Sequence, residues 1–438
     1  MYQHLDRIPE QLPGEPNPPP ATPGVVAVVV LRQLVGIALA LAALPALLLL
    51  YLPLWLVYGR PPIVFSAARW AHLLRLTWTA RASAPPIRAS MRLRAVLDLI
   101  WQGLTAPFWG VCWLLDEVLY GRELARNPVT APLLEISAAR SGSTQLGHYL
   151  EEDPQLAAPS ALQALMPFLW LWRLAARAGP ARKARFRERL LGTFPPEFAQ
   201  RHETEPFRTD TLDIPWFFYQ LNVVARALGP DVLASDGLFG PNGPSDRTYW
   251  ERDFVGFVDG LGRRTLAFAG PGPDGRPRRL FLKGHFLGGA PALERRYPDA
   301  RFLTVVRTPG PRLRSEINFL RVSPPLMGLG YTPWAWLVPS ILATEVDYCE
   351  AEMAFYARPG AARCVIRFDD YVRDLRGALR TVYRVCLDQE TLPPHLPTEH
   401  EPRKRTDYLI DRSLEQLGID EAALDQRLSA YLAWVRAG

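Results

Sequence analysis

A short polar loop after an apolar segment is the first feature of this sequence that could do chemistry. Residues Ala139–Thr144 (ARSGST) follow the apolar run Leu133–Ala138, and apolar residues at helical spacing begin beyond Thr144. A strand, a tight loop and a helix in this order point backbone N–H groups and a helix N-terminus at one anion. The loop adds a positive charge, hydroxyl donors and a flexible bend: Arg140, Ser141, Gly142, Ser143 and Thr144. We therefore predict a phosphate or sulfate site, with a helix-capping Ser/Gly turn as the alternative.

Three further apolar segments end in charged or titratable residues. They are Arg279–Lys283, followed by Gly284 and His285; Arg301–Arg307; and Cys364–Phe368, followed by Asp369 and Asp370. Because the carboxyl ends of parallel strands meet at one edge of a sheet, Arg140, Lys283 and Arg307 are expected to gather there. The loop at Arg140 lacks the Gly-Lys-Ser/Thr of a Walker A motif, which argues against a typical nucleotide kinase.

The elements that must position these residues alternate between strand and helix. Helical patterns cover Pro291–Tyr297, Pro311–Arg321, Leu337–Tyr356 and Val372–Leu387, between and after the strand segments. This alternation predicts an α/β fold, a doubly wound parallel sheet flanked by helices. Residues 151–277 interrupt it with mostly helical patterns, including one over Ala161–Ala178, and we expect a helical insertion that binds the acceptor.

Composition narrows the classes of ligand and site. The chain has 438 residues and a formal net charge of +6, which suits anionic ligands or an anionic membrane surface and is too small to indicate nucleic acid. Its four cysteines have no C-x-x-C spacing, so neither a zinc site nor a disulfide framework is expected.

The N-terminal part has the composition of a membrane-associated region. Residues 1–24 are polar and rich in proline, as in a disordered tail. Residues 34–57 carry no charge over 57 − 34 + 1 = 24 positions, enough to cross a bilayer that needs about 20. Pro45 and Pro53 make a re-entrant hairpin a second possibility, and a buried core helix is a third.

A second apolar stretch, Leu99–Leu115, suits an interfacial or core helix, so residues 25–125 are predicted to form a membrane-associated helical module. Arginines are concentrated after the first apolar segment, so the positive-inside rule predicts the bulk of the chain on the cytoplasmic side.

Four segments in order resemble the sulfotransferases that use 3′-phosphoadenosine 5′-phosphosulfate (PAPS). They are ARSGST, FLKGHFL, YPDARFLTVVRTPGPRLRSE and RFDDYVRDL, and the resemblance extends over roughly Leu133–Arg436 with a divergent middle. It is closest to the bacterial branch with an R-S-G-[ST]-T loop. The resemblance implies a P-loop-type sulfotransferase domain, expected here over residues 127–438.

The resemblance also implies roles for the strand-end residues. Arg140–Thr144 would bind the 5′-phosphosulfate, and Arg307 and Ser315, 315 − 307 = 8 positions apart, would hold the 3′-phosphate. Lys283 and His285 are similar to a K-x-H of the cytosolic branch, in which the Lys stabilises the transferring group and the His is the general base. A group with a near-neutral pKa suits that role. No metal is expected.

Some of the assignments keep rivals. Glu205, Glu203 and His148 are alternative bases, because the bacterial branch more often has K-S-P at this point and related branches use a carboxylate. Arg403 and Lys404, with Arg405, resemble the basic loop that closes over the 3′-phosphate, although a solvated charge run is the alternative.

The sequence therefore predicts transfer of a sulfuryl group from PAPS to a hydroxyl, in line and with a general base. The membrane module suggests a hydrophobic or membrane-associated acceptor, such as a lipid or glycolipid. The alternatives are another P-loop enzyme, such as a kinase, and a non-catalytic membrane protein with a degenerate sulfotransferase domain.

Overall fold

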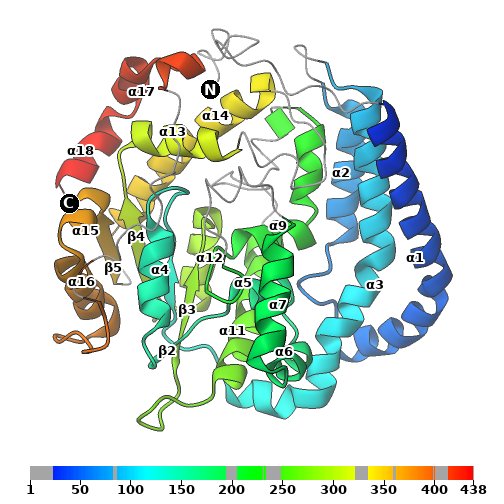
Figure 1. Cartoon of the computed structure of the whole chain (residues 1–438), viewed down its shortest axis with the longest axis horizontal. Helices are drawn as coiled ribbons and strands as arrows, with labels where there is room; N and C mark the ends of the chain where they lie inside the picture. Colours follow the sequence, from blue (N-terminus) through cyan, green and yellow to red (C-terminus); the bar gives the residue numbers. More distant parts are fainter. Residues whose placement is uncertain are drawn as a thin grey trace.

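A five-stranded parallel sheet with the order β2-β3-β1-β4-β5 organises the chain (Figure 1). The computed structural model describes residues 23–81, 86–193, 205–229, 231–232, 248–320, 334–358, 362–397, 399 and 413–437. The strands are β1 (Leu133–Glu135), β2 (Leu156–Ala157), β3 (Arg279–Lys283), β4 (Arg301–Val306) and β5 (Arg363–Arg367). Since β1 lies in the middle, later strands are added first on one side and then on the other. This is the predicted doubly wound, P-loop-type arrangement.

The register of the sheet brings strand-end residues together. Glu135 of β1 is the in-register partner of Lys283 of β3 and of Leu303 of β4. Beyond Lys283, the backbone N–H of Gly284 still donates to the carbonyl oxygen of Glu135, at 3.0 Å. The loops that follow β1 and β3 therefore leave the sheet side by side.

Side chains alternate along the strands, so the sheet has two apolar faces. Leu133 and Phe281 pack on one face, together with α4 (Ser143–Glu151), α15 (Phe368–Arg373) and α16 (Leu375–Leu387). Leu134 and Leu282 pack on the other, in the largest cluster of buried apolar residues. Helices of that second layer are α5 (Ala161–Leu165), α6 (Leu169–Ala176), α9 (Asp213–Tyr219), α11 (Val255–Ala269) and α12 (Ala290–Arg296), with α7 (Pro180–Leu191) outside them; short helical turns are η2 (Asn222–Ala227), η3 (Thr248–Phe254) and η4 (Leu287–Gly289).

The helix expected over Ala161–Ala178 is two helices, α5 and α6. A proline disfavours helical backbone in the residue before it, and Met166, which precedes Pro167, has φ −121° and ψ 76°. The break lets α6 begin at Leu169 in a new direction.

A buried polar network joins the last helices to β4. These helices are α13 (Pro309–Leu320), α14 (Trp334–Tyr356), η6 (Glu415–Leu417), α17 (Glu421–Arg427) and α18 (Ser429–Ala437). Arg312 of α13 donates to Glu345 at 2.7 Å and to the Tyr431 hydroxyl at 3.3 Å, and that hydroxyl donates to Glu352 at 2.7 Å. The Thr304 hydroxyl of β4 also donates to Glu352, at 2.6 Å. The network thus fixes α13 against the sheet and the C-terminal helix.

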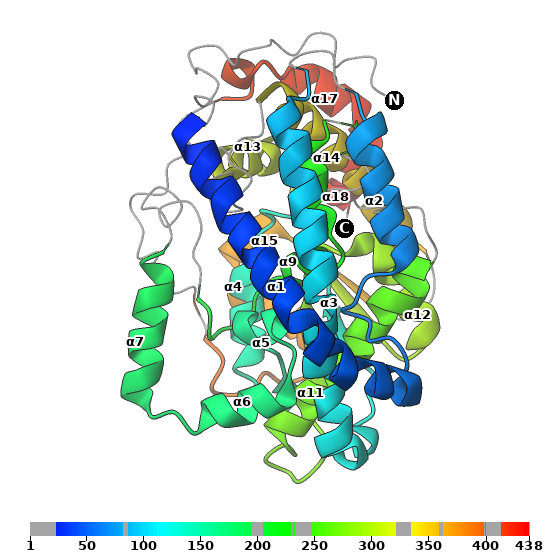
Figure 2. The same cartoon turned by 90° about the vertical axis from the view of Figure 1, so that its right-hand side faces the viewer.

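Three helices lie side by side across one flank of the molecule: α1 (Pro23–Tyr58), α2 (Ala67–Thr79) and α3 (Ala89–Arg126) (Figure 2). Within α1, Ala27–Tyr58 is long and apolar enough to cross a membrane. Only 6% of its apolar 18-residue stretch is buried in the protein. The apolar stretch Leu99–Leu115 lies inside the much longer α3, which continues through Pro107.

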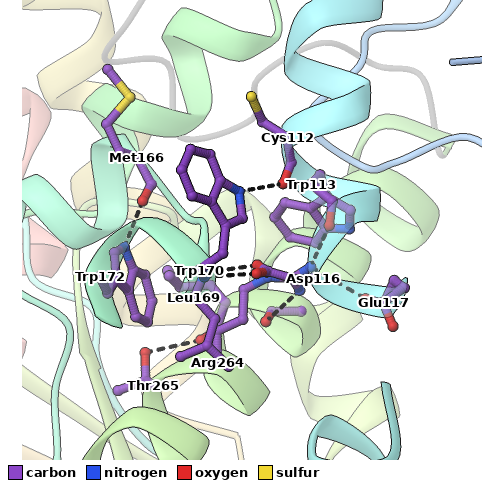
Figure 3. A network of polar contacts seen from close by, with 12 residues as sticks. Cys112, Trp113, Asp116, Glu117, Met166, Leu169, Trp170, Trp172, Arg264 and Thr265 are labelled. Atoms are coloured by element: carbon purple, nitrogen blue, oxygen red, sulfur yellow. Dashed lines mark hydrogen bonds and ion pairs between the residues drawn. The ribbon is translucent and has the colours of Figure 1, made fainter. Parts of the chain in front are cut away.

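An ion pair between Asp116 and Arg264 ties α3 into the core of the sheet domain (Figure 3). The carboxylate accepts from Arg264 at 2.8 Å and from the backbone N–H groups of Leu169 and Trp170, at 2.7 and 2.8 Å. Arg264 also lies 3.8 Å above the Trp113 ring and is 1% exposed. The domain boundary predicted near residue 126 stays a prediction. The C-terminal half of α3, which ends at that residue, contributes to the core of the sheet domain.

Candidate functional site

The loop between β1 and α4 has the backbone of an anion cradle. Arg140 and Gly142 have φ values of +63° and +87°, in the left-handed region. The alternation of left-handed and ordinary residues turns successive N–H groups toward one side of a loop. Gly142 also precedes the first residue of α4 and supplies no side-chain cap, so the N–H groups of the first turn are available to a ligand.

Arg140, Ser315 and Arg307 meet at this loop, although they come from three elements. Arg140 Nε donates to the Ser315 hydroxyl of α13 at 3.0 Å. Arg307, which follows β4, donates from Nη1 to the carbonyl oxygen of Arg140 at 2.8 Å, and its guanidinium lies 4.2 Å from the centre of the Phe368 ring. Two guanidinium groups and a hydroxyl therefore converge, as recognition of a phosphate requires.

Two observations test whether the loop fits a phosphosulfate. Ser141 is fully buried, and its hydroxyl has no hydrogen-bond partner among the described residues. Such an orphan group costs free energy unless a ligand pairs with it. A Cβ on Gly142 would stand 2.8 Å from the Phe368 ring, so only glycine fits between that ring and the loop. Both the polar group and the tight backbone suit an oxyanion held by the loop.

Lys283 lies at the end of β3, buried except for 2% of its surface. Gly147 of α4 makes room for it, because a Cβ there would come within 3.0 Å of Lys283 Cδ. The ammonium is 3.7 Å from the Asp210 carboxylate, which comes from the loop before α9. A buried charge is held in place by such partners and is strongly felt by any ligand nearby.

Glu135, the register partner of Lys283, is fully buried. Burial raises the pKa of its carboxyl to about 7, against the opposing effects of Lys283 and of a hydrogen bond from Ser137. One carboxyl oxygen, Oε2, has no partner among the described residues. The centre of the site therefore holds a carboxyl group that titrates near neutral pH.

His285 is half-buried and held by three bonds. Its backbone N–H donates to both oxygens of Asp213, at 2.7 and 2.8 Å. Its ring Nδ1 is 2.7 Å from the carbonyl oxygen of Ser137. A carbonyl can only accept, so Nδ1 carries the proton and Nε2 is the basic nitrogen. Burial lowers the pKa of the imidazole, opposed by Asp213, so the ring is neutral and able to take up a proton.

The intervening Gly284 allows this arrangement. A Cβ at Gly284 would stand 2.5 Å from Asp213 Oδ1 and 2.6 Å from the Phe286 ring. Asp213, 3% exposed, also accepts from the Thr211 hydroxyl at 2.7 Å. The K-G-H spacing thus places a carboxylate directly against the backbone between the lysine and the histidine.

The rival bases lie in other surroundings. His148 is buried in α4, 3.2 Å from the carbonyl oxygen of Thr209, and burial lowers its pKa to about 4. Glu205 accepts from Arg187 of α7 at 2.7 Å, and this bond lowers the pKa of its carboxyl. Glu203, Arg403, Lys404 and Arg405 lie outside the described residues.

Sequence reasoning missed Glu135, Asp210 and Asp213. The signal for Glu135 was a charged residue inside an otherwise apolar strand segment. The signal for the aspartates was their spacing in RTDTLDI, just before an aromatic helix. Among the described residues, no group of three His, Cys, Asp or Glu side chains could hold a metal ion.

Comparison with known proteins bears on the family and the fold of the chain. The sequence profile described as "Sulfotransferase family" matches residues 132–387, more than half of the chain. Sulfotransferase STF9 from Mycobacterium avium has a TM-score of 0.56 at 16% identity, over 88% of this chain and 95% of its own. Sulfotransferase STF1 from Mycobacterium tuberculosis H37Rv has a TM-score of 0.56 at 15% identity, over 87% of this chain and 97% of its own. These two structures are similar in fold, and the search of curated proteins gives no match. By the profile match, the chain belongs to the sulfotransferase family.

Proposed function

We propose that this protein transfers a sulfuryl group from PAPS to the hydroxyl of a hydrophobic or membrane-associated acceptor. The observation that carries the proposal is the meeting of Arg140, Ser315 and Arg307 beside the loop. In the family, the 3′-phosphate that distinguishes PAPS is held by residues at these positions of the motif. The loop Arg140–Thr144 and the N-terminus of α4 would hold the 5′-phosphosulfate, with the Ser141 hydroxyl as one donor.

The chemistry asks for charge stabilisation and for a base. PAPS supplies an activated sulfuryl group whose leaving group is the 5′-phosphate. The acceptor oxygen forms a bond to sulfur as the bond from sulfur to the phosphate oxygen breaks, and the acceptor proton moves to Nε2 of His285. The Lys283 ammonium stabilises the negative charge that grows on the leaving oxygen. The carbonyl oxygen of Ser137 accepts from Nδ1 of the imidazole, which leaves Nε2 as the basic nitrogen, and Asp213 holds the backbone N–H of the same residue.

Nucleotide binding tests the donor site. Titration calorimetry should show that the full chain binds 3′-phosphoadenosine 5′-phosphate (PAP) at least tenfold more tightly than AMP. Arg307→Ala should remove this preference and change AMP binding little, because AMP lacks the 3′-phosphate. Arg295→Ala, at an exposed arginine paired with Glu251, is the matched control and should keep it. Equal binding of PAP and AMP by the unmodified chain would overturn the proposal.

Turnover of the variants tests the base. His285→Ala should lower kcat by about 10²–10⁴, the usual contribution of a general base. Glu205→Ala, the rival, should keep kcat within a few-fold, because Glu205 is paired with Arg187. The reverse order of the two effects would assign the base to Glu205.

The basic loop at Arg403 and Lys404 is proposed to close over the 3′-phosphate.

Membrane association is the second part of the proposal. The exposed, apolar α1 supports an N-terminal anchor, with the sheet domain on the cytoplasmic side. An anchored enzyme meets acceptors that are dissolved in the bilayer, such as lipids or glycolipids. Flotation of the full chain with lipid vesicles tests this part independently of nucleotide binding.

A further inference from the structure

The way α1 lies on α3 limits how this protein can meet a membrane. Toward the start of α1, Gln33 donates to the carboxylate of Asp98, and Gly36 is so close to Trp101 that an added Cβ would stand 2.9 Å from the ring. Farther along, the Tyr51 ring packs directly on Gly110. These contacts are 51 − 33 = 18 residues apart, or about 27 Å of helix. Helix α1 therefore follows α3 and does not project from the molecule (Figure 2).

Helix α3 cannot follow α1 into a bilayer. Its C-terminal half is core: Trp113 is 4% exposed, and Asp116 is fully buried in its ion pair with Arg264. Just after α1, Arg60 forms an ion pair with Asp253 of η3, whose side chain is 5% exposed. Both halves of α1 are thus attached to the folded domain.

The length of α1 also argues against a simple crossing. Its 36 residues correspond to about 54 Å, far more than the roughly 30 Å of a hydrocarbon core. A helix lying on a surface has no such mismatch. The apolar character of α1 on all sides also follows, because one side faces α3 and the opposite side faces outward, as at Leu49 and Leu56, which are 77% and 78% exposed.

The outward surface complements a bilayer in both polarity and charge. Helix α3 adds the half-exposed Trp101 and Phe108, aromatic residues typical of the membrane interface. Residues 23–126 as a whole contain ten arginines and four acidic residues, 10 − 4 = +6, although Arg69 is buried and Arg60 and Arg94 are in ion pairs. Helices α1 and α3 begin, and α2 ends, at the same end of the three-helix layer formed by α1, α2 and α3. Three exposed arginines lie near this end: Arg32, Arg75 and Arg81. Anionic lipid headgroups suit such a rim.

We propose that α1 lies in the plane of an anionic membrane surface, with both of its ends on the side of the catalytic domain. The protein is then attached to one leaflet and does not cross the bilayer. This inference rests on the membrane anchoring in the proposed function and specifies its geometry. The sheet domain would meet acceptors of that leaflet alone.

Single-cysteine labelling of the full chain in sealed vesicles tests the geometry. Gly24→Cys and Tyr58→Cys mark the two ends of α1, and Arg276→Cys, in an exposed loop before β3, marks the domain. The native cysteines are buried. An impermeant maleimide should label all three positions in one vesicle orientation and none in the other. Labelling of Gly24→Cys from the side opposite to the other two would overturn the proposal.

Surface variants give the second readout. The double variant Leu49→Glu and Leu56→Glu should weaken flotation with phosphatidylglycerol vesicles at least tenfold and leave PAP binding unchanged. Leu174→Glu, at an exposed leucine on α6, is the matched control and should float normally. Undiminished flotation of the double variant contradicts the proposal. If the full chain binds PAP but does not float with any vesicle, membrane anchoring itself is contradicted. If the full chain does not bind PAP, the proposed donor site is contradicted instead.

Discussion

Glu135 and Lys283 are register partners at the ends of two central strands, and both are buried. Each supports the other in a place where a lone charge would be costly. Ser137 extends this relationship, because its hydroxyl bonds Glu135 and its carbonyl oxygen accepts from His285. The carboxyl, the ammonium and the imidazole therefore form one connected unit, and a change at any of them should be felt at the others.

The titration of Glu135 predicts a pH dependence of stability. Its pKa is about 7 in the folded chain and near 4.5 in the unfolded chain, so the folded state binds the extra proton between these values. Folding stability from this group is therefore full below pH 4.5 and is lost as the pH rises to about 7. In Glu135→Gln this loss should vanish, so that denaturant unfolding shows the variant gaining roughly 3 kcal/mol relative to the unmodified chain across the window.

His148 offers the contrasting variant for that experiment. Its pKa is about 4 in the folded chain, below the usual 6.5, so its burial costs stability at low pH and the cost disappears as the pH rises through this interval. The difference between His148→Gln and the unmodified chain should thus slope in the opposite direction. Slopes of the same sign in the two variants would contradict the titration described for at least one of the two groups.

Gly284→Ala tests the contact between Asp213 and the strand end. The new methyl group would collide with the carboxylate and with Phe286, which must shift. We expect kcat to fall more than tenfold and unfolding free energy to fall by about 1–3 kcal/mol, as for other overpacked sites. Gly179→Ala, where nothing lies within 4 Å of the added carbon, is the control. Normal turnover in Gly284→Ala would show that the position of Asp213 does not matter for catalysis.

Ser141→Ala separates a ligand-binding role from a structural one. The hydroxyl is buried without a protein partner, so its removal should leave the thermal midpoint unchanged or slightly raised. If the hydroxyl donates to the phosphosulfate, the affinity for PAP should fall by about tenfold or more, because hydrogen bonds to charged groups contribute about 1.5–3 kcal/mol. Unchanged affinity, measured by calorimetry, would remove Ser141 from the donor site.

Asp116→Asn tests the connection between α3 and the sheet domain. The substitution leaves Arg264 buried without its counter-charge and weakens the bonds to the first N–H groups of α6. Breaking a buried pair in this way costs about 3–5 kcal/mol, which chemical denaturation should detect. Glu123, also on α3, forms a half-exposed ion pair with Arg173 of α6. Breaking this pair in Glu123→Gln should cost less than about 1 kcal/mol. Equal small losses would show that α3 is only loosely attached.

Local sequence patterns predicted the fold class because strands and helices leave short-range patterns of apolar residues in the sequence. Arg279–Lys283 was predicted with the bounds that the structure gives to β3, and the apolar run at Leu133 and the helix after the loop were also found. The strand β2, Leu156–Ala157, was missed because two residues leave no periodic pattern. The helix expected over Ala161–Ala178 divides at Pro167 for two reasons together: proline disfavours helical backbone in the residue before it, and α5 and α6 pack separately.

The polar surroundings of the site could not be predicted in the same way. Glu135 and Lys283 are 283 − 135 = 148 positions apart in the chain, and only the strand order makes them neighbours. Arg140 is likewise distant in the chain from Arg307 and Ser315, and the fold makes them neighbours. The resemblance to sulfotransferases, and not the spacing of these residues in the sequence, predicted that they act together. Asp213 is recognisable only once the helical insertion is seen to return to the end of β3.

The network around Arg312 has a consequence for the order in which the site is assembled. Ser315 lies one turn beyond Arg312 on α13, and Arg312 is fully buried against Tyr431 of α18. Ser315 and Tyr431 are 431 − 315 = 116 positions apart, so α13 gains this buried partner only after α18 has been synthesised and has folded onto it. The Ser315 side of the candidate site is therefore completed late in folding, by a helix that supplies none of the residues placed in the site.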